Sequence, residues 1–234
     1  MYIAIDTSTD TASLALVQDG AILAELTWHC GQNHSTQLLP QLSHLLAQVK
    51  LALSSAEGII VARGPGSYNG LRVGMSTAKG LAFSLDIPIV GISTLELEAY
   101  QHAGRGLPVC PILNATRGEI ATAMYQLKED EWTQLNGEHL TTVDALCSLI
   151  ISPTVFCGEF VPIIAAELRR QLGGKAVILS PAAGLRRAGF LGELGLRRIS
   201  AGDDDDPATL QPSYLRGPAI TQPKHSQKEG QLSE

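Results

Sequence analysis

A glycine-rich turn is the part of this sequence whose residue types and spacing could do chemistry. It reads ARGPGSYNG over residues 62–70, after an apolar run and before a helical pattern that spans 71–85. Free backbone N–H groups at the start of a helix can bind a phosphate group. The turn does not match the P-loop template, which requires a lysine after its second glycine. Nor does it match the dinucleotide-binding template, because Asn69 stands where a third glycine is needed.

Small residues give the same stretch a second interpretation. Gly70, Gly74, Ala78 and Ala82 recur every four residues, so the predicted helix has one face with almost no side chains. Such a face allows very close contact with a neighbouring element. We therefore interpret these glycines first as residues for close packing and second as a phosphate cradle.

The composition limits the class of protein. The chain has 234 residues, of which 44% are hydrophobic, and a net charge of −6 at pH 7. These values allow one large domain or two small ones, and the negative charge gives no general attraction to nucleic acid or anionic membranes. No stretch approaches the roughly 20 apolar residues of a membrane span. The start also lacks the basic segment of a signal peptide.

The four cysteines indicate a reducing compartment. Cys30, Cys110, Cys147 and Cys157 are widely spaced and form no CxxC pair. We therefore expect free, mostly buried thiols in a cytoplasmic protein. Structural zinc is not expected, because the close ligand spacings that it needs are missing.

The pattern of apolar residues predicts an α/β fold with two similar halves. Strands are expected at 2–6, 12–17 and 21–27, with a hairpin turn at 18–20, followed by helices at 35–50 and 71–85. After a linker at 102–108 the order of elements is similar. This second half includes a strand pair around Asn136–Gly137 and a helix at 185–200. Such alternation favours mixed sheets covered by helices.

The element order also predicts the division of the chain. Residues 1–103 are expected to form a first lobe and residues 104–206 a second, degenerate lobe. The acidic run 203–206 is expected to be an exposed loop. Residues 218–234 are polar, with little to bury, and are expected to be disordered.

Six motifs occur together in an order that resembles one protein family. They read IAIDTST…SLAL, HSTQLLPQL, ARGPGSYNGLRVGMSTAKGLAF, IPIVGISTLE, NATRGEI and PSYLR. As a set they are similar to the bacterial TsaB family, also called YeaZ, whose members act in the synthesis of threonylcarbamoyladenosine in tRNA. The similarity is clear over about residues 1–127 and weaker over 205–216.

The resemblance implies a fold of the actin, Hsp70 and sugar-kinase (ASKHA) kind, with two duplicated RNase-H-like lobes. In such folds the end of the chain returns to the first lobe, which is expected here for residues 207–217. Nucleotide-binding members carry an acid and a glycine in the first hairpin. Here Asp6, Thr7 and Ser8 keep the acid but not the glycine, and Asn114 replaces an acid in the second half. The resemblance thus implies no required cofactor and at most weak ATP or ADP binding. A carboxylate that caps its own turn is the alternative role for Asp6.

The resemblance also bears on metal binding. TsaD, the catalytic relative in the same system, carries two metal-binding histidines in the motif HHMEGH. The same place here reads STLELE, so the two ligand positions become Thr94 and Glu98. A transition-metal site of that kind requires the imidazoles, and we therefore expect no bound metal and no catalytic residue.

The family implies a non-catalytic dimerisation or scaffold subunit that binds TsaD. Through that complex it would support threonylcarbamoyl transfer to the adenosine next to the tRNA anticodon. Other implied partners are TsaE and TsaC in the pathway, tRNA indirectly, and a second copy of the chain when TsaD is absent. In family members, the two long helices of the first lobe pair with the same helices of the partner. The residues expected at or near this interface are His34, Gln37, Gln41, His44, Arg72, Gly74, Ser76 and Lys79.

Two other functions stay open as alternatives. The first is an ATP-dependent kinase or hydrolase of the actin-like fold, and the second is a metallo-hydrolase, which the missing histidines disfavour. Arg117 could reach a phosphate, although a surface arginine is the simpler interpretation. The pairs Arg169–Arg170, Arg186–Arg187 and Arg197–Arg198 could form a patch that faces tRNA, but charges on solvated helix faces are the preferred explanation.

Overall fold

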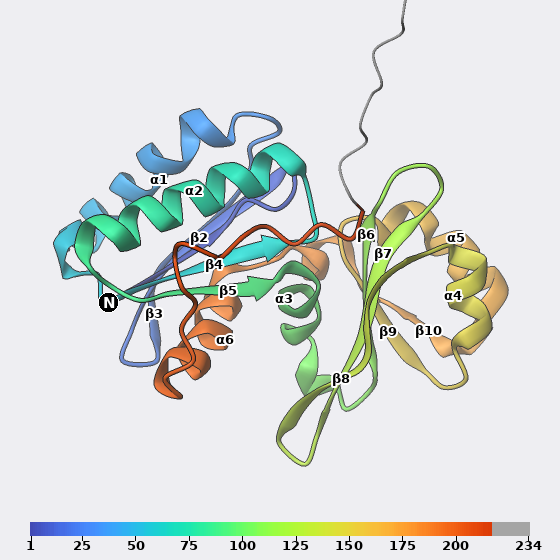
Figure 1. The fold of residues 1–234 in the computed structure, drawn as a ribbon. Coiled ribbons are helices and arrows are strands. Elements are labelled where there is room, and N and C mark those ends of the chain that lie inside the picture. Colours follow the sequence, from blue (N-terminus) through green and yellow to red (C-terminus); the bar gives the residue numbers. More distant parts are fainter. Residues whose placement is uncertain (217–234) are drawn as a thin grey trace, which may run out of the picture.

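The structure is a computed structural model that describes residues 1–216. The chain forms two lobes, each built on a five-stranded sheet with helices against it (Figure 1). The expectation of disorder at 218–234 lies outside the described residues. Within residues 1–216, no helix combines the length and the apolar character that a membrane crossing needs.

The first sheet has the strand order β3-β2-β1-β4-β5. Its central strand β1 pairs antiparallel with β2 and parallel with β4, so an antiparallel unit continues into a parallel one. The hairpin between β2 and β3 turns at Asp19 and Gly20, which both have positive φ, as the sequence predicts. The strands are β1 (Tyr2–Asp6), β2 (Thr11–Gln18), β3 (Ala21–His29), β4 (Gly58–Gly64) and β5 (Ile89–Ser93).

The second sheet repeats this arrangement. Its order is β10-β9-β6-β7-β8, which read from β8 corresponds strand for strand to the first sheet and confirms the predicted duplication. The predicted strand pair around Asn136–Gly137 is wrong, because the hairpin turns at Glu129 and Asp130, both with positive φ, and Asn136 lies inside a strand. The strands are β6 (Val109–Asn114), β7 (Ile120–Lys128), β8 (Glu131–Thr141), β9 (Thr154–Cys157) and β10 (Ala176–Ile178).

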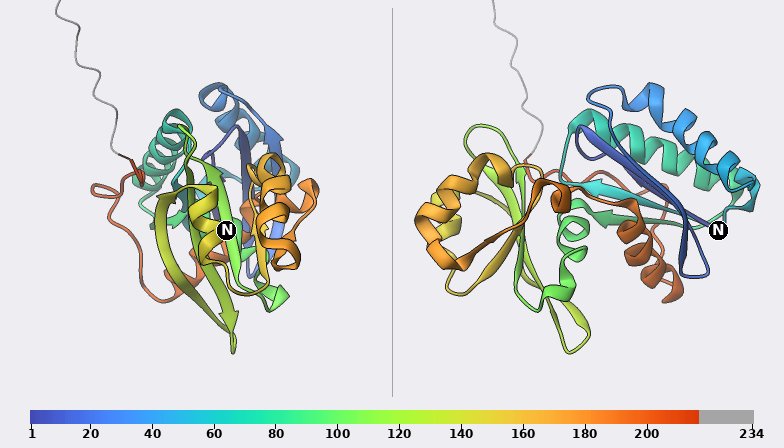
Figure 2. Two further views of the ribbon diagram at one scale, coloured as in Figure 1. Left: turned by 90° about the vertical axis from the view of Figure 1, so that its right-hand side faces the viewer. Right: turned by 180° about the vertical axis from the view of Figure 1, so that it is seen from behind.

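Helices cover both faces of the first sheet (Figures 1 and 2). The α1 and α2 helices lie side by side on one face and α6 lies on the other, while α3 lies between the lobes and α4 and α5 cover the second sheet. The α-helices are α1 (His34–Gln48), α2 (Tyr68–Leu85), α3 (Thr94–Tyr100), α4 (Val143–Leu149), α5 (Val161–Leu172) and α6 (Ala188–Ser200). Short 3-10 turns occupy Leu53–Ser55, Ala103–Arg105, Gly173–Lys175 and Pro181–Gly184.

The position of α6 corrects the expected domain boundary. The sequence-based division places it in the second lobe, within 104–206. In the structure it packs across β1, β2, β4 and β5 of the first sheet. Three glycines on one side of α6 make this possible, since a Cβ on Gly189, Gly192 or Gly195 would overlap side chains of β3, β2 or β4. The first lobe is therefore built from two separate parts of the chain.

A segment after α6 returns along the first lobe, as expected for 207–217. The backbone N–H of Asp205 donates to the carbonyl of Ile89 at 2.9 Å, and that of Ser213 donates to the carbonyl of Arg63 at 2.6 Å. The side chain of Leu210 joins the core under α2. In Figure 1 this red segment runs from α6 towards the second lobe, where Arg216 forms an ion pair with Glu119. The acidic run 203–206 is a largely exposed loop, as expected, and its half-buried Asp205 attaches it to β5.

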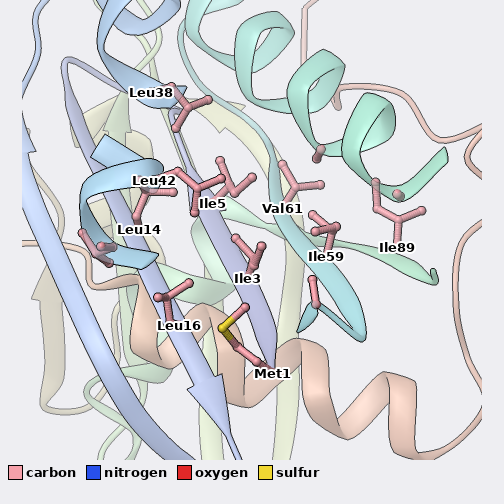
Figure 3. Packing of buried hydrophobic residues seen from close by; sticks show 14 of the residues in the cluster. Met1, Ile3, Ile5, Leu14, Leu16, Leu38, Leu42, Ile59, Val61 and Ile89 are labelled. Carbon is pink, nitrogen blue, oxygen red and sulfur yellow. The ribbon is translucent and has the colours of Figure 1, made fainter. Parts of the chain in front are cut away.

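The largest core cluster lies between the first sheet and the α1–α2 layer. Apolar side chains from the strands β1, β2, β4 and β5 meet Leu38 and Leu42 of α1 there (Figure 3). Ile3, Ile5 and Leu14 are fully buried at its centre. The apolar residues that recur at helical spacing over 38–49 predict an amphipathic helix, and most of them contact this core, whereas Leu39 is exposed.

Close packing explains the glycines of the turn and of α2. Gly66, Gly70 and Gly74 face the β1–β2 turn, and a Cβ on each would overlap an atom of Thr7 or Ser8. The hydroxyl of Thr7 donates to the carbonyl of Gly70 at 2.8 Å. The preferred interpretation of the small-residue face is therefore confirmed, and the element that it approaches belongs to the same lobe.

Two glycines on α2 should respond in opposite directions to the same substitution. Gly74→Ala should lower the free energy of unfolding by about 1–3 kcal/mol, because its methyl group would overlap the Thr7 hydroxyl. Gly80→Ala should raise it by about 0.5–1 kcal/mol, since no atom lies within 4 Å and alanine favours the helix. Urea unfolding followed by circular dichroism measures both. A neutral or stabilising Gly74→Ala would contradict the packing described here.

Candidate functional site

The β1–β2 turn, where the sequence leaves at most a degraded phosphate site, is buried, and its side chains form hydrogen bonds within the protein. Asp6, Thr7 and Ser8 are at most 1% exposed. One carboxylate oxygen of Asp6 accepts hydrogen bonds from the backbone N–H of Ser8 at 2.9 Å and from its hydroxyl at 2.5 Å. This is the geometry of a carboxylate that caps its own turn, which was the alternative role for Asp6.

The other oxygen of Asp6 holds an arginine from a distant part of the chain. Nε of Arg186 donates to Asp6 Oδ2 at 2.9 Å, and one terminal nitrogen donates to Glu98 Oε2 of α3 at 3.3 Å. The second terminal nitrogen donates to the hydroxyl of Thr9 at 2.6 Å and lies 3.1 Å from Glu159 Oε1. Arg186 is 1% exposed, so a complete guanidinium group is buried among three carboxylates.

This cluster joins the two lobes. Asp6, Thr9 and Glu98 belong to the first lobe, whereas Glu159 follows β9 in the second. Arg186 lies in the segment that crosses from the second lobe to α6. A direct bond reinforces the junction, because the hydroxyl of Thr9 also donates to Glu159 Oε1 at 2.8 Å.

Burial and charge act in opposite directions on these groups. Burial alone would lower the pKa of Arg186, but the carboxylates of Asp6, Glu159 and Glu98 raise it above its ordinary value. Burial raises the pKa of Glu98 to about 7, an effect that the neighbouring Arg186 only partly offsets. The arginine is therefore always charged, while Glu98 gains its proton near neutral pH.

Three buried groups beside the cluster come close enough to share a metal ion. The ligand atoms of Glu98, His102 and Cys157 lie within 4.8 Å of one another. However, Glu98 Oε2 accepts from Arg186 and its other oxygen accepts from Gln101 at 3.2 Å. Burial also raises the pKa of the Cys157 thiol well above its ordinary value, which favours the protonated thiol. The adjacent guanidinium charge opposes a second cation, so the expectation of no metal stays a prediction.

The cleft between the lobes is open and acidic. A hollow of about 620 Å³ lies between the start of α2 and the start of α5. Among its described lining residues the charged side chains are Asp10 and Glu159, which are both acidic. Phosphate groups would be repelled there unless a cation accompanied them.

The structure separates the residues expected at the partner interface into two groups. His34 is 4% exposed and its ring donates to the carbonyl of Thr9 at 2.8 Å, while Gly74 is buried against Thr7. Neither reaches the surface to contact a partner directly, and the expected interface at or near these residues stays a prediction. Lys79 donates to the carbonyl of Leu210, in the segment after α6, at 3.0 Å. Gln37 accepts from the indole of Trp28 at 2.9 Å, Gln41 is half-buried, and His44, Arg72 and Ser76 are exposed.

Two apolar residues on the same helix layer are exposed, although the sequence did not single out Phe83 and its spacing placed Leu39 in the apolar stripe of α1. Phe83 near the end of α2 is 85% exposed, and Leu39 on α1 is 50% exposed. Phe83 follows Arg72 and Ser76 at intervals of four and seven residues, which places the three on one side of α2. That periodicity could have identified Phe83, because it stands opposite the face of small residues.

Several arginines of the three pairs have partners within the chain, and the cysteines are free thiols. Arg187 pairs with Glu25 and Arg198 pairs with Asp203 and Asp205, so these charges are balanced within the chain. Arg186 is buried, contrary to the expected solvated face. The four cysteines are free and buried, as the sequence predicts.

The raised pKa of Glu98 makes a testable contribution to stability. A carboxyl whose pKa is higher in the folded state than in the unfolded state stabilises the fold at low pH, and this contribution is lost as the pH rises through the folded value. For Glu98 that window extends from about 4.5 to about 7. The stability of the native chain relative to Glu98→Gln should therefore fall between pH 5 and pH 8.

Urea unfolding at several pH values measures the free energy of unfolding of the native chain and of Glu98→Gln. Subtracting one from the other removes the contributions of titratable groups that both proteins share. Glu131→Gln, at an exposed position of β8, is the control. Its free energy of unfolding should depend on pH in the same way as that of the native chain. A difference for Glu98→Gln that is constant or that grows with pH would contradict the assignment.

Comparison with known proteins identifies the family. The family model described as TsaD: tRNA N6-adenosine threonylcarbamoyltransferase matches residues 28–158. The tRNA threonylcarbamoyladenosine biosynthesis protein TsaB of Bacillus subtilis is 35% identical over 92% of this chain and 93% of its own length. The TsaB of Escherichia coli is 35% identical over 55% of this chain and 56% of its own length.

Solved structures agree with the sequence comparison. YeaZ from Pseudomonas aeruginosa is 25% identical, covers 91% of this chain and 99% of its own, and has a TM-score of 0.75. A second structure from that organism, described as similar to peptidase YeaZ, is 26% identical with a TM-score of 0.78 over 92% of this chain and 99% of its own. The two sheets of matching strand order thus form the expected ASKHA fold, and the chain belongs to the TsaB family of tRNA threonylcarbamoyladenosine biosynthesis proteins.

Proposed function

We propose that this chain is a non-catalytic subunit that binds TsaD through the outer face of α1 and α2. In this role it supports transfer of a threonylcarbamoyl group to adenosine in tRNA. The observation that carries the proposal is the pair of exposed apolar side chains, Phe83 and Leu39, on a helix layer whose inner face is already packed. Exposed aromatic residues of this size are typical anchors of protein interfaces.

The composition of that face fits a partner that is also soluble alone. His44 on α1 and Arg72 and Ser76 on α2 are also exposed and provide polar groups on the same two helices. Interfaces between separately folded proteins combine an apolar centre with such a rim. The same face would serve for pairing with a second copy of the chain when TsaD is absent.

The buried cluster supports a role without catalysis. Both oxygens of Asp6 are occupied by groups of the chain itself, and the cleft lining carries acids rather than bases. Magnesium-bound nucleotide would need that carboxylate or a basic lining. Under this proposal TsaE and TsaC act in the same pathway on other subunits, and tRNA contacts this chain only through the complex.

Substitutions on the proposed face should weaken binding to TsaD without unfolding the chain. Phe83→Asp should raise the Kd by at least tenfold, because it places a charge where an apolar anchor is buried. Gln41→Ala and Arg72→Ala should have smaller effects in the same direction, since rim contacts contribute less. Isothermal titration calorimetry with TsaD from the same organism measures each Kd, and circular dichroism checks the fold.

The second lobe provides the matched control for this experiment. Leu149 on α4 is 62% exposed, so Leu149→Asp makes the same kind of change on a different surface. This variant should bind TsaD as the native chain does. If Phe83→Asp binds normally while Leu149→Asp or Arg117→Ala does not, the interface lies on the second lobe and the proposed placement is wrong.

The alternative, an ATP-dependent kinase or hydrolase of the same fold, predicts turnover by the isolated chain. Purified protein with ATP and Mg²⁺ should release no phosphate above the blank under the present proposal. A phosphate-release assay with Asp6→Asn as the comparison distinguishes the two. Turnover by the native chain that disappears in Asp6→Asn would establish the enzyme and exclude the scaffold role as the whole function.

A further inference from the structure

The buried guanidinium group of Arg186 is the feature that the proposed function does not use. Arg186 belongs to the segment that crosses between the lobes, and its guanidinium group bonds to both lobes. Its partners are Asp6, Thr9, Glu98 and Glu159. In many two-lobed proteins a ligand bound between the lobes sets their relative orientation. Here a side chain of the protein occupies that position.

We propose that Arg186 is a built-in cation that fixes the orientation of the two lobes, so that the arrangement requires no bound ligand. The inference concerns the isolated chain and is independent of TsaD binding. Its chemical basis is shared ion pairing, because one guanidinium group contacts carboxylates that come from three separate elements. It also explains why Arg186 differs so sharply in environment from its neighbour Arg187.

The first step of the argument is electrostatic. Asp6 and Glu98 are 0% exposed, and both point at the same guanidinium group. Without Arg186 these carboxylates would be buried with no cation, which is strongly unfavourable. The cluster is therefore intact only when the crossing segment delivers Arg186 to the turn after β1.

The second step concerns the second lobe. Glu159, at 29% side-chain exposure, is its contribution to the cluster and lies in the loop between β9 and α5. It contacts both Arg186 and Thr9, so one carboxylate connects the second lobe to the crossing segment and to the first lobe. Loss of Glu159 should loosen this connection between the lobes while leaving Asp6 and Glu98 paired with Arg186.

The third step is a comparison with the adjacent residue. Arg187 pairs with Glu25 of β3, but its side chain is 51% exposed, against 1% for Arg186. Exposed ion pairs contribute little to stability, whereas removal of one partner from a buried pair is costly. The two arginines thus form a matched pair for mutation, since they share the segment and differ in burial.

Chemical rescue provides the first test. Arg186→Gly should lower the Tm by roughly 10 °C, and about 10 mM guanidinium chloride, far below the molar range that unfolds proteins, should restore several degrees. The same concentration of sodium chloride should not. Arg187→Gly should lower the Tm only slightly, and guanidinium should not raise the Tm of this variant. An Arg186→Gly variant as stable as Arg187→Gly, or one that guanidinium does not stabilise, would overturn the proposal.

Lobe orientation provides the second test. Spin labels on cysteines introduced at Ser43 of α1 and Ser148 of α4, both exposed, report the distance between the lobes, and the four native cysteines are buried. Pulsed electron paramagnetic resonance should give a single narrow distribution of label-to-label distances for the native chain without added ligand. Glu159→Ala and Arg186→Gly should broaden it, and guanidinium should narrow it again for Arg186→Gly.

Two further variants keep this test decisive. Glu167→Ala removes the partner of Arg170 on the surface of α5 and should leave the distance narrow. Arg186→Lys keeps the charge with a single nitrogen, and it replaces Arg186→Gly if that variant is not recovered folded. It should show a lower Tm and a broader distance. Equal, narrow distances in the native chain, Glu159→Ala and the Arg186 variant would show that Arg186 does not fix the lobes.

Discussion

A guanidinium group can be buried only where carboxylates and hydroxyls surround it, and this requirement organises the centre of the molecule. Arg186 brings together the turn after β1, the helix α3 and the loop after β9, which are far apart in the sequence. This β1–β2 turn also contacts both helices of the outer layer, through His34 on α1 and Gly70 on α2. Replacement of Arg186 should therefore affect the β1–β2 turn, α3 and the loop after β9 together.

Glycines provide the complementary constraint on the first sheet. The α2 helix approaches the β1–β2 turn through Gly66, Gly70 and Gly74, and α6 approaches the opposite face through its own three glycines. Each helix therefore lies nearer than ordinary side chains permit. Since the backbone of the turn is held on one side by α2 and on the other by Arg186, its carboxylate has little freedom to bind anything from solvent.

The sequence predicted what depends on local periodicity. The strands, the amphipathic α1, the small-residue face of α2 and the duplicated order of elements all follow from spacing along the chain. The position of α6 was mispredicted because the sheet that it covers is determined by packing, although the spacing of Gly189, Gly192 and Gly195 carried a signal. The role of Arg186 could not be predicted, because its partners Asp6 and Glu98 are 180 and 88 residues away. The residues next to Arg186 in the sequence do not distinguish it from the exposed Arg187.

The discontinuous first lobe affects how the chain is completed during synthesis. Strands β1 to β5 leave the ribosome early, but the sheet face that includes Ile60 and Val17 stays uncovered until α6 has been made. The second lobe, by contrast, is continuous and can finish its sheet first. The lobe that begins first is therefore completed last, and a chain broken off before residue 188 exposes an apolar surface suited to aggregation.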